Sequence, residues 1–368
     1  MLDLTQIVAG PVCTRMLADL GADVVKVDQP ADDPFVRRRT AGPAGQNVGK
    51  RSIILDLKCE AGLNVARSLL ADADVLVENY RPGALASLGL GYSDAAAINP
   101  RLIYTTISGF GSDTSFAGRG AYGATAHAEA GWLWVQQQAQ GGPEPFAPGV
   151  TVADLATGMN ACTAILAALY DREKTGAGQF INVTLMDSQL AVLAEAAAPA
   201  LSGEPFVPFR HGLQRTSDGF VAVNAGSPRN WRRLAETVGA DEAATRDGKA
   251  VERAVGEWTE SHTTAEAAAA LAAAGAPYGV VHTLQEALDH PYFTERGMVA
   301  ELPDPLRGTT RVIDSPMRFS QAEVGPVSGA PLAGEHTATI LAELGLDAAQ
   351  IAELLRSGAA QAAAEEPR

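Results

Sequence analysis

The segment VTVADLATGMNACTAILAALYDREKT, residues 150–175, places one acidic residue, Asp154, in front of a long apolar run with the pattern of a helix. Aspartate is one of the residues that favour helix N-caps, and a negative charge there complements the helix dipole. On the pattern alone, the first interpretation of Asp154 is therefore a helix cap. The alternative is a carboxylate that takes part in chemistry, and this segment by itself does not separate the two.

The P-loop, G-x-S-x-G and H-E-x-x-H motifs do not occur in the sequence. Gly109 and Gly111 indicate a turn, because no helix start or later acidic residue completes a dinucleotide site. His127 is expected to be a hydrogen-bonded or exposed histidine rather than a ligand or a base. The run Arg37–Arg39 fits either a solvated face or a phosphate clamp.

The composition excludes several classes of partner. The formal net charge of −15 repels phosphate backbones and anionic lipid headgroups, which argues against nucleic acid and membranes as partners. The three cysteines are scattered without a C-x-x-C pair, so we expect neither a zinc site nor a disulfide framework, and no metal. The N-terminal segment MLDLTQIVAGP lacks the pattern of a signal peptide, and we expect a cytoplasmic protein.

The elements that must position these residues alternate between helical and extended patterns. Helical patterns over residues 11–21 and 59–73 are followed by extended patterns over residues 22–28 and 74–79, and another extended pattern covers residues 99–111. Strands separated by helices of this length predict βαβ units and a parallel sheet, and therefore an α/β fold.

A break in this pattern at residues 199–217, rich in proline and glycine, predicts a linker that leaves the first domain. We predict a large domain over residues 1–200, a small domain with its linkers over 201–305, and a C-terminal part with two helices over 306–368. The 368 residues and the 46% hydrophobic content are ample for two cores.

Six segments in the same order resemble the family III CoA-transferases, the group that also contains formyl-CoA transferase and the α-methylacyl-CoA racemases. They span residues 9–28, 49–58, 73–92, 99–111, 153–187 and 334–346. The resemblance implies a large Rossmann-like parallel-sheet domain built from both termini, to which residues 306–368 return, and a smaller central α+β domain. It also implies an interlocked homodimer.

The resemblance changes the interpretation of Asp154, which falls where the transferases carry their catalytic aspartate. The implied activity moves coenzyme A between an acyl-CoA and a small free carboxylic acid, through an aspartyl anhydride and an aspartyl-CoA thioester. The thioester bond energy is conserved, so neither ATP nor a metal is needed. The start of a helix keeps a carboxylate ionised, which suits a nucleophile.

The resemblance also implies the coenzyme A contacts. The segment VENYRPG matches the stretch that holds the nucleotide, which indicates Asn79, Tyr80 and Arg81. Further positions at or next to family contact positions are Val8, Leu55, Arg119 and Tyr122. Charge alone adds Lys50 and the run Arg37–Arg39 as candidate phosphate partners.

Departures from the family pattern concern the reaction itself. Racemases have a histidine followed by an aspartate where this chain has Tyr122 and Gly123, and a phenol is a poor proton acceptor at neutral pH. Many transferases carry an acid at the second of these positions, so Gly123 is unusual for them too. Val8 replaces a glutamine of the formyl- and oxalyl-specific members, which argues against formate or oxalate as the substrate.

Three functions follow from this comparison. The favoured one is a CoA-transferase with Asp154 as the nucleophile. An acyl-CoA racemase or isomerase on the same fold is the first alternative, with Asp154 as one of its bases. A CoA-binding subunit without catalytic turnover is the second, because an acid that the family carries has been replaced by Gly123.

Overall fold

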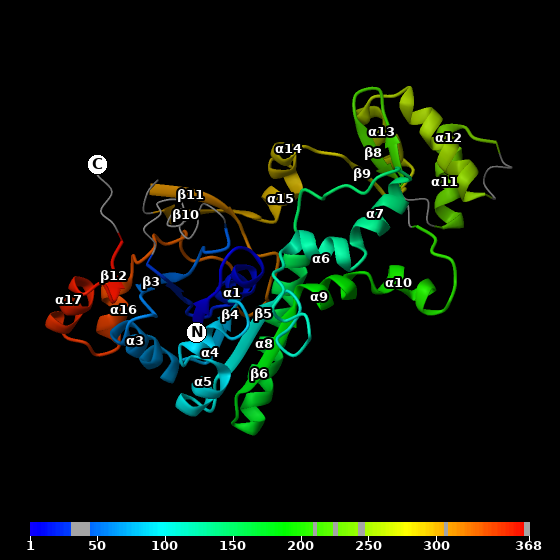
Figure 1. Ribbon diagram of the computed structural model, residues 1–368. Helices are drawn as coiled ribbons and strands as arrows, with labels where there is room; N and C mark the ends of the chain where they lie inside the picture. Colours follow the sequence, from blue (N-terminus) through cyan, green and yellow to red (C-terminus); the bar gives the residue numbers. More distant parts are fainter. Residues whose placement is uncertain (31–44, 209–211, 224–226, 242–246, 305–307, 364–368) are drawn as a thin grey trace. The chain divides into compact units, whose positions relative to one another are not determined.

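The computed structural model describes residues 1–30, 45–208, 212–223, 227–241, 247–304 and 308–363 (Figure 1). The chain divides into two compact units. The large unit comprises Met1–Gln138, Gly142–Phe206 and Gly297–Arg368, and the small unit comprises Ala139–Gly141 and Val207–Arg296. Both ends of the chain therefore contribute to the large unit.

The main sheet lies in the large unit and has seven strands among the described residues, in the order β12-β3-β2-β1-β4-β5-β6. Their bounds are β1 Leu2–Leu4, β2 Val25–Asp28, β3 Arg51–Leu55, β4 Val75–Glu78, β5 Ile103–Ser108, β6 Gln179–Thr184 and β12 Ala360–Gln361. All neighbouring pairs are parallel except β12, which pairs antiparallel with β3. The order reverses between β1 and β4, which is where open α/β sheets bind ligands, beyond the carboxyl ends of the strands.

Helices cover both faces of this sheet, because alternate residues of its strands face opposite sides. Leu76 packs in one core cluster with residues of α3 and α16, while its neighbours Val75 and Val77 pack in another with residues of α1 and α8. The helices of the large unit are α1 Ala9–Asp19, α3 Glu60–Ala71, α4 Ala84–Ser87, α5 Tyr92–Ile98, α6 Gly123–Glu129, α7 Trp132–Gln140, α8 Val152–Thr175, α9 Leu185–Val192, α10 Ala194–Leu201, α16 Thr337–Glu343 and α17 Ala348–Arg356, with the end of α7 crossing into the small unit. The predicted α/β fold with a parallel sheet is confirmed.

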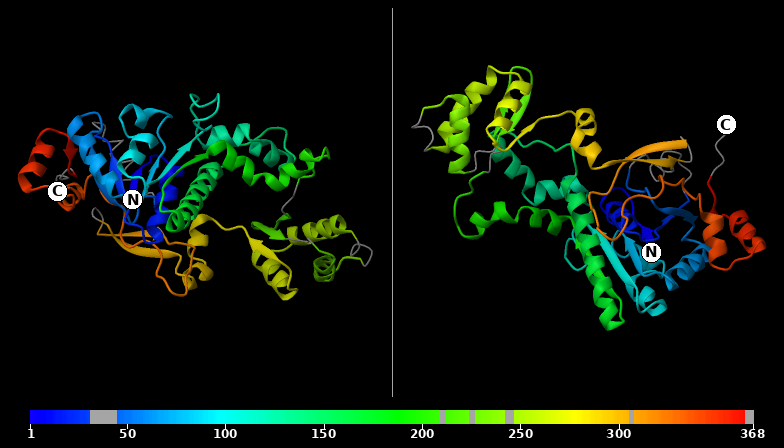
Figure 2. Two further views of the ribbon diagram at one scale, coloured as in Figure 1. Left: turned by 90° about the horizontal axis from the view of Figure 1, so that it is seen from below. Right: turned by 180° about the vertical axis from the view of Figure 1, so that it is seen from behind.

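Helix α8 runs beside β5 and β6 and packs closely on α1 (Figure 2). A Cβ on Gly158 would lie 2.7 Å from the carbonyl oxygen of Ala9 and 2.7 Å from Cγ1 of Val12, so glycine is required for this approach. Among the described residues α8 is the one helix that is long and apolar enough to cross a membrane, and a buried core helix passes the same test of length and composition.

A short antiparallel pair completes the large unit, β10 Val299–Asp304 and β11 Gly308–Ile313. Leu302 and Val312 of this pair pack on Val48. The small unit has its own core around Leu234, Val251 and Leu271, beside the antiparallel sheet β7-β8-β9. Its elements are β7 Leu213–Arg215, β8 Phe220–Val223, α11 Pro228–Val238, α12 Gly248–Glu260, α13 Thr264–Ala273, β9 Tyr278–Val280, α14 Leu284–Leu288 and α15 Pro291–Glu295.

Candidate active site

Asp154 lies in the first turn of α8, where it is 7% exposed. The N-cap of this helix is Thr151, so the interpretation of Asp154 as the cap residue is wrong by three positions. The side chain of Thr151 and the main-chain N–H groups of Gly123 and Asp154 are the polar groups that stabilise its charged form. Asp154 is therefore a buried carboxylate at a helix start with three polar groups beside it.

Burial and hydrogen bonding act in opposite directions on the acidity of Asp154. Burial raises the pKa of its carboxyl group above the ordinary value, because the charged form loses water. Thr151, Gly123 and the main-chain N–H of Asp154 lower the pKa, since each of these polar groups stabilises the charged form. The burial effect is the larger, so this carboxylate is weakly solvated and more basic than an exposed aspartate. Both properties favour attack on an electrophilic carbon.

Gly123 begins α6 directly against this carboxylate. A Cβ on Gly123 would overlap Oδ2 of Asp154 and would also lie 3.3 Å from Cβ of Thr151. The preceding residue, Tyr122, is the N-cap of α6 and is 70% exposed. The fold thus brings Tyr122, the residue before Gly123, near Asp154, and it gives a steric reason for glycine at position 123.

His127 lies one turn after Gly123 on α6 and is buried. Its Nε2 accepts a hydrogen bond of 3.1 Å from the N–H of Ala153, the residue before Asp154. Burial lowers the pKa of this imidazole, which favours the neutral form that can accept a hydrogen bond. The structure agrees with the expectation of a hydrogen-bonded histidine.

A second part of the site lies at the reversal of strand order, where β1 and β4 end. Main-chain N–H of Gln6 donates to Oδ1 of Asn79 over 2.8 Å, and Nδ2 of Asn79 donates to the carbonyl oxygen of Gln6 over 2.7 Å. Ile7 follows with a φ of 71°, a strained conformation for a β-branched residue, and Val8 precedes α1. The loops after β1 and β4 are therefore held together by the two hydrogen bonds between Gln6 and Asn79.

Tyr80 and Arg81 extend from the same clamped loop after β4. The hydroxyl of Tyr80 accepts a hydrogen bond of 3.0 Å from Nε2 of Gln29, which follows β2. Arg81 is exposed. The structure thus brings Val8, Asn79 and Tyr80, with Arg81 beside them, to the edge at which a parallel sheet of this order binds a nucleotide.

The two parts of the site are joined by the packing of α8 on α1. Helix α1 begins right after Val8, and its first turn contacts Gly158, which lies one turn after Asp154. Ala9 and Ala153 also share one core cluster. The nucleotide edge and the carboxylate therefore lie on neighbouring first turns of two packed helices.

Two further predicted contacts, Leu55 and Arg119, lie outside these loops. The side chain of Leu55 is 0% exposed in the core, so only its main chain remains for a ligand. Arg119 is exposed, pairs with Glu129 over 2.8 Å and lies 4.9 Å from the ring centre of Phe110. No observation tests these two contacts, which stay predictions. The run Arg37–Arg39 lies outside the described residues.

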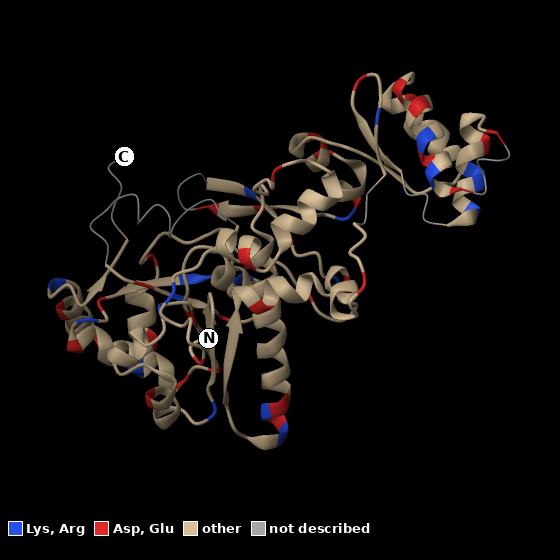
Figure 3. Ribbon diagram, turned by 45° about the vertical axis from the view of Figure 1, so that its right-hand side comes forward, with Lys and Arg blue, Asp and Glu red and all other residues tan. Residues whose placement is uncertain are grey.

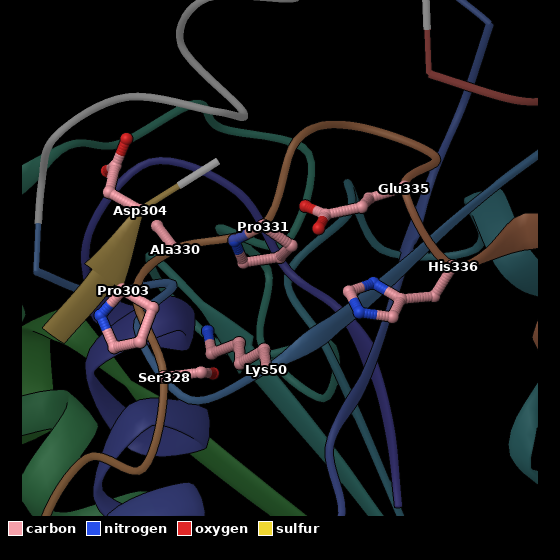
Figure 4. Close-up of a pocket in the computed structure, with 9 residues that line it drawn as sticks. Lys50, Pro303, Asp304, Ser328, Ala330, Pro331, Glu335 and His336 are labelled. Carbon is pink, nitrogen blue, oxygen red and sulfur yellow. The ribbon is translucent and has the colours of Figure 1, made fainter. Parts of the chain in front are cut away.

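The ammonium group of Lys50 is hydrogen-bonded inside the protein. Its Nζ donates to Oδ2 of Asp3 over 2.9 Å, to Oγ1 of Thr14 over 2.8 Å and to Oδ1 of Asn47 over 3.1 Å. Its stem lines a cavity of about 270 Å³ whose other polar lining includes Glu335 and His336 (Figure 4). A buried ammonium with three internal partners is not free to hold a phosphate, so the proposal of Lys50 as a phosphate partner is wrong.

Sequence reasoning missed several contributors to the site. Glu78 ends β4 beside Asn79, and burial raises its pKa to about 7. Gln6 supplies the main chain that Asn79 clamps, and Thr151 caps α8. In the sequence, the position of Glu78 at the end of a predicted strand could have indicated a site residue. The partners of Gln6 and Thr151 depend on tertiary packing and leave no such pattern. In the described part of the chain no group of three or more potential metal ligands comes together.

Comparisons with known proteins support this geometry. The model of the CoA-transferase family III matches residues 1–337. The chain is 33% identical to human succinyl-CoA:glutarate CoA-transferase over 97% of its own length and 88% of that protein. It is 32% identical to succinyl-CoA:mesaconate CoA-transferase of Haloarcula marismortui over 94% of its own length and 96% of that protein. A crystal structure of a CAIB/BAIF family protein from Brucella suis superposes with a TM-score of 0.79 at 32% identity, covering 93% of this chain and 97% of the other.

Proposed function

Because the chain belongs to the CoA-transferase family III, we propose that it moves coenzyme A from an acyl-CoA to a free carboxylic acid through covalent intermediates on Asp154. The observation that carries the mechanism is the setting of Asp154. Its carboxylate is buried at the start of α8, lies against Gly123 and is close to the exposed Tyr122. Such a group is oriented and weakly hydrated before substrate arrives.

The first half of the reaction transfers coenzyme A to the protein. A carboxylate oxygen of Asp154 attacks the thioester carbon, the C–S bond breaks, and a mixed anhydride and the CoA thiolate form. The thiolate then attacks the Cγ of Asp154, which releases the first acid as its carboxylate and leaves an aspartyl-CoA thioester. Each step passes through an oxyanion, and main-chain N–H groups are the usual donors for such a charge.

The second half reverses these steps with another acid. The incoming carboxylate attacks the Cγ of Asp154 and expels the CoA thiolate, and a second mixed anhydride forms. The thiolate attacks the acyl carbon of that anhydride, which releases the new acyl-CoA and restores the Asp154 carboxylate. One thioester is consumed and one is made, so the exchange needs no external source of energy.

The named activities of the relatives support a narrower substrate class. The human and Haloarcula relatives are named for succinyl-CoA with glutarate or mesaconate, and another is named for succinyl-CoA with L-malate. We propose succinyl-CoA as the donor and a short dicarboxylic acid as the acceptor. Exchange with monocarboxylic acids at equal rates would count against this narrower proposal.

The surroundings of His127 favour transfer over racemisation. A racemase needs a base that can take the α-proton of the acyl group, and Nε2 of His127 is occupied by the N–H of Ala153. Tyr122 is the residue that faces solvent beside Asp154, and a phenol is a poor base at neutral pH.

The surface of α8 supports a homodimer. Met159, Leu166 and Tyr170 form an exposed apolar stripe along this helix, and its charged residues other than Asp154 gather near its C-terminal end (Figure 3). We propose that a second copy of the chain covers this stripe, in the interlocked arrangement that the family resemblance implies. Sedimentation at nanomolar concentration should show dimer alone, and a folded monomer there would contradict a linked pair.

The activity test uses succinyl-CoA with glutarate, mesaconate, malate and acetate as acceptors, with chromatographic separation of the CoA esters. A new dicarboxylyl-CoA is the expected product. In parallel, a 2-methylacyl-CoA is incubated in deuterium oxide, and deuterium at Cα would identify a racemase. Binding of acyl-CoA with neither reaction would identify a non-catalytic subunit, and either of the last two results would overturn the proposal.

A further inference from the structure

The junction of α6 and α8 contains a buried histidine whose hydrogen-bond partner is the residue before Asp154. His127 is 3% exposed, and its Nε2 accepts the N–H of Ala153 over 3.1 Å. Ala153 is the second residue of α8 and is completely buried. The hydrogen bond therefore satisfies a main-chain donor at the helix start that water cannot reach.

The chemistry of this bond sets the state of the imidazole. The first N–H groups of a helix have no partner within it, and a buried donor without an acceptor is costly. Nε2 can accept only in the neutral imidazole whose proton is on Nδ1. Burial lowers the pKa of His127, which is consistent with that neutral form. The ring of Trp132 lies 6.1 Å away between centres and covers one side of the imidazole.

Two residues of α6 therefore contact the start of α8, one at the nucleophile and one at the residue before it. Gly123 lies against the carboxylate of Asp154, and His127, one turn later, accepts the N–H of Ala153. Together they fix the main chain and the side chain of this turn. A shift of α6 would move both contacts at once.

We propose that His127 is a positioning residue, which holds the first turn of α8 so that the Asp154 carboxylate stays aimed at the thioester carbon. This inference rests on the proposed function of Asp154. His127 itself does not exchange a proton with substrate. Because the nucleotide contacts lie on the loops after β1 and β4, loss of the His127 bond should lower turnover and leave binding of acyl-CoA unchanged.

The kinetic test compares His127→Leu with His127→Gln. Leucine removes the acceptor, and glutamine supplies a carbonyl oxygen that can take the N–H of Ala153. We expect His127→Leu to lower kcat by about 10- to 100-fold with KM for acyl-CoA changed by less than about threefold. His127→Gln should recover kcat to within about threefold of the wild type. Full kcat in the leucine variant, or equal losses in both variants, would overturn the proposal.

A matched control comes from His290 of the small unit. Its Nδ1 accepts the N–H of Tyr292 over 3.1 Å at the start of α15, which is the same kind of bond at an exposed helix. His290→Leu should leave kcat within about twofold of the wild type. A loss equal to that of His127→Leu would mean that any histidine-capped helix affects turnover, and the special role of His127 would be contradicted.

Two readouts do not depend on activity or on the leucine variant folding normally. Nitrogen chemical shifts of ¹⁵N-labelled wild-type protein should show His127 neutral, with its proton on Nδ1. Hydrogen exchange in His127→Gln should keep the amide of Ala153 protected. A proton on Nε2, or an unprotected Ala153 amide in the wild type, would overturn the positioning role. An inactive wild type with every acyl-CoA would instead count against the proposed function.

Discussion

Gly123 lies directly against the carboxylate of Asp154, so close to Oδ2 that a side chain at position 123 does not fit between them. Two helices that begin 29 residues apart in the chain thus meet at a single carboxylate. The glycine that looked out of place in the sequence is the residue that this contact requires.

Gly123→Ala should therefore impair both stability and exchange. The added methyl group must displace the Asp154 carboxylate, and overpacking of this kind costs about 1–3 kcal/mol. We expect at least about a tenfold loss of CoA exchange, because the nucleophile is turned from its direction of attack. Thermal unfolding and steady-state kinetics measure the two effects.

Gly118 provides the control, since it lies in the preceding loop with nothing within 4 Å of an added Cβ and no positive φ. Gly118→Ala should behave as the wild type. Equal behaviour of the two alanine variants would show that the contact between Gly123 and Asp154 has no consequence.

Asn79→Ala should weaken the binding of coenzyme A. The substitution removes both hydrogen bonds that hold the loops after β1 and β4 together, while Asp154 keeps its own donors. We expect KM for acyl-CoA to rise about three- to tenfold with kcat little changed. Asn64→Ala, at an exposed position of α3, is the matched control. A fall in kcat with KM unchanged would contradict the assignment of these loops to binding.

Glu78→Gln should change the dependence of stability on pH. Burial raises the pKa of Glu78 from 4.5 to about 7, so between these values the folded wild type holds a proton that the unfolded chain has lost. The wild type should lose stability relative to the variant as pH rises through this window, by up to about 3 kcal/mol, since one pKa unit corresponds to ~1.4 kcal/mol. Urea unfolding at pH 4.5 and pH 8 measures the difference. A difference that does not change with pH would contradict the raised pKa.

Asp154→Asn should stabilise the fold while it abolishes exchange. Burial raises the pKa of this carboxyl group, so the stability that its neutral form gives is present at low pH and is lost as pH rises through the raised pKa. We expect the asparagine variant to be more stable than the wild type by ~1 kcal/mol at pH 7, and the gap to close in acid. A variant that is less stable at pH 7 would show that the hydrogen bonds outweigh the cost of burial.

Much of the fold could be predicted from the sequence, because buried parallel strands separated by helices leave a clear alternation of extended and helical patterns. The strands at Val25–Asp28, Val75–Glu78 and Ile103–Ser108 lie within predicted extended segments. The seventh strand, Ala360–Gln361, was not predicted, and it forms by pairing with Leu55 and Ile54. Pairing between residues three hundred positions apart leaves no local signal.

In the candidate site, too, some features could be predicted from the sequence and others could not. The helix start that carries Asp154 and the loop that carries Asn79 were visible in the sequence. The clamp between Asn79 and Gln6, the bond between His127 and Ala153, and the internal use of Lys50 all depend on packing between distant segments. The domain boundaries at residues 200 and 305, the interlocked dimer and the cytoplasmic location stay predictions.

The central claim is that Asp154 carries the covalent intermediates. The direct measurement is mass spectrometry of the protein after incubation with succinyl-CoA, with peptide mapping of any adduct. The account predicts that coenzyme A is bound as a thioester to the peptide that contains Asp154. In Asp154→Ala we expect no adduct and no exchange, while its affinity for CoA stays within about tenfold of that of the wild type. Exchange above about 5% of the wild-type rate in Asp154→Ala, or an adduct on another residue, would contradict it.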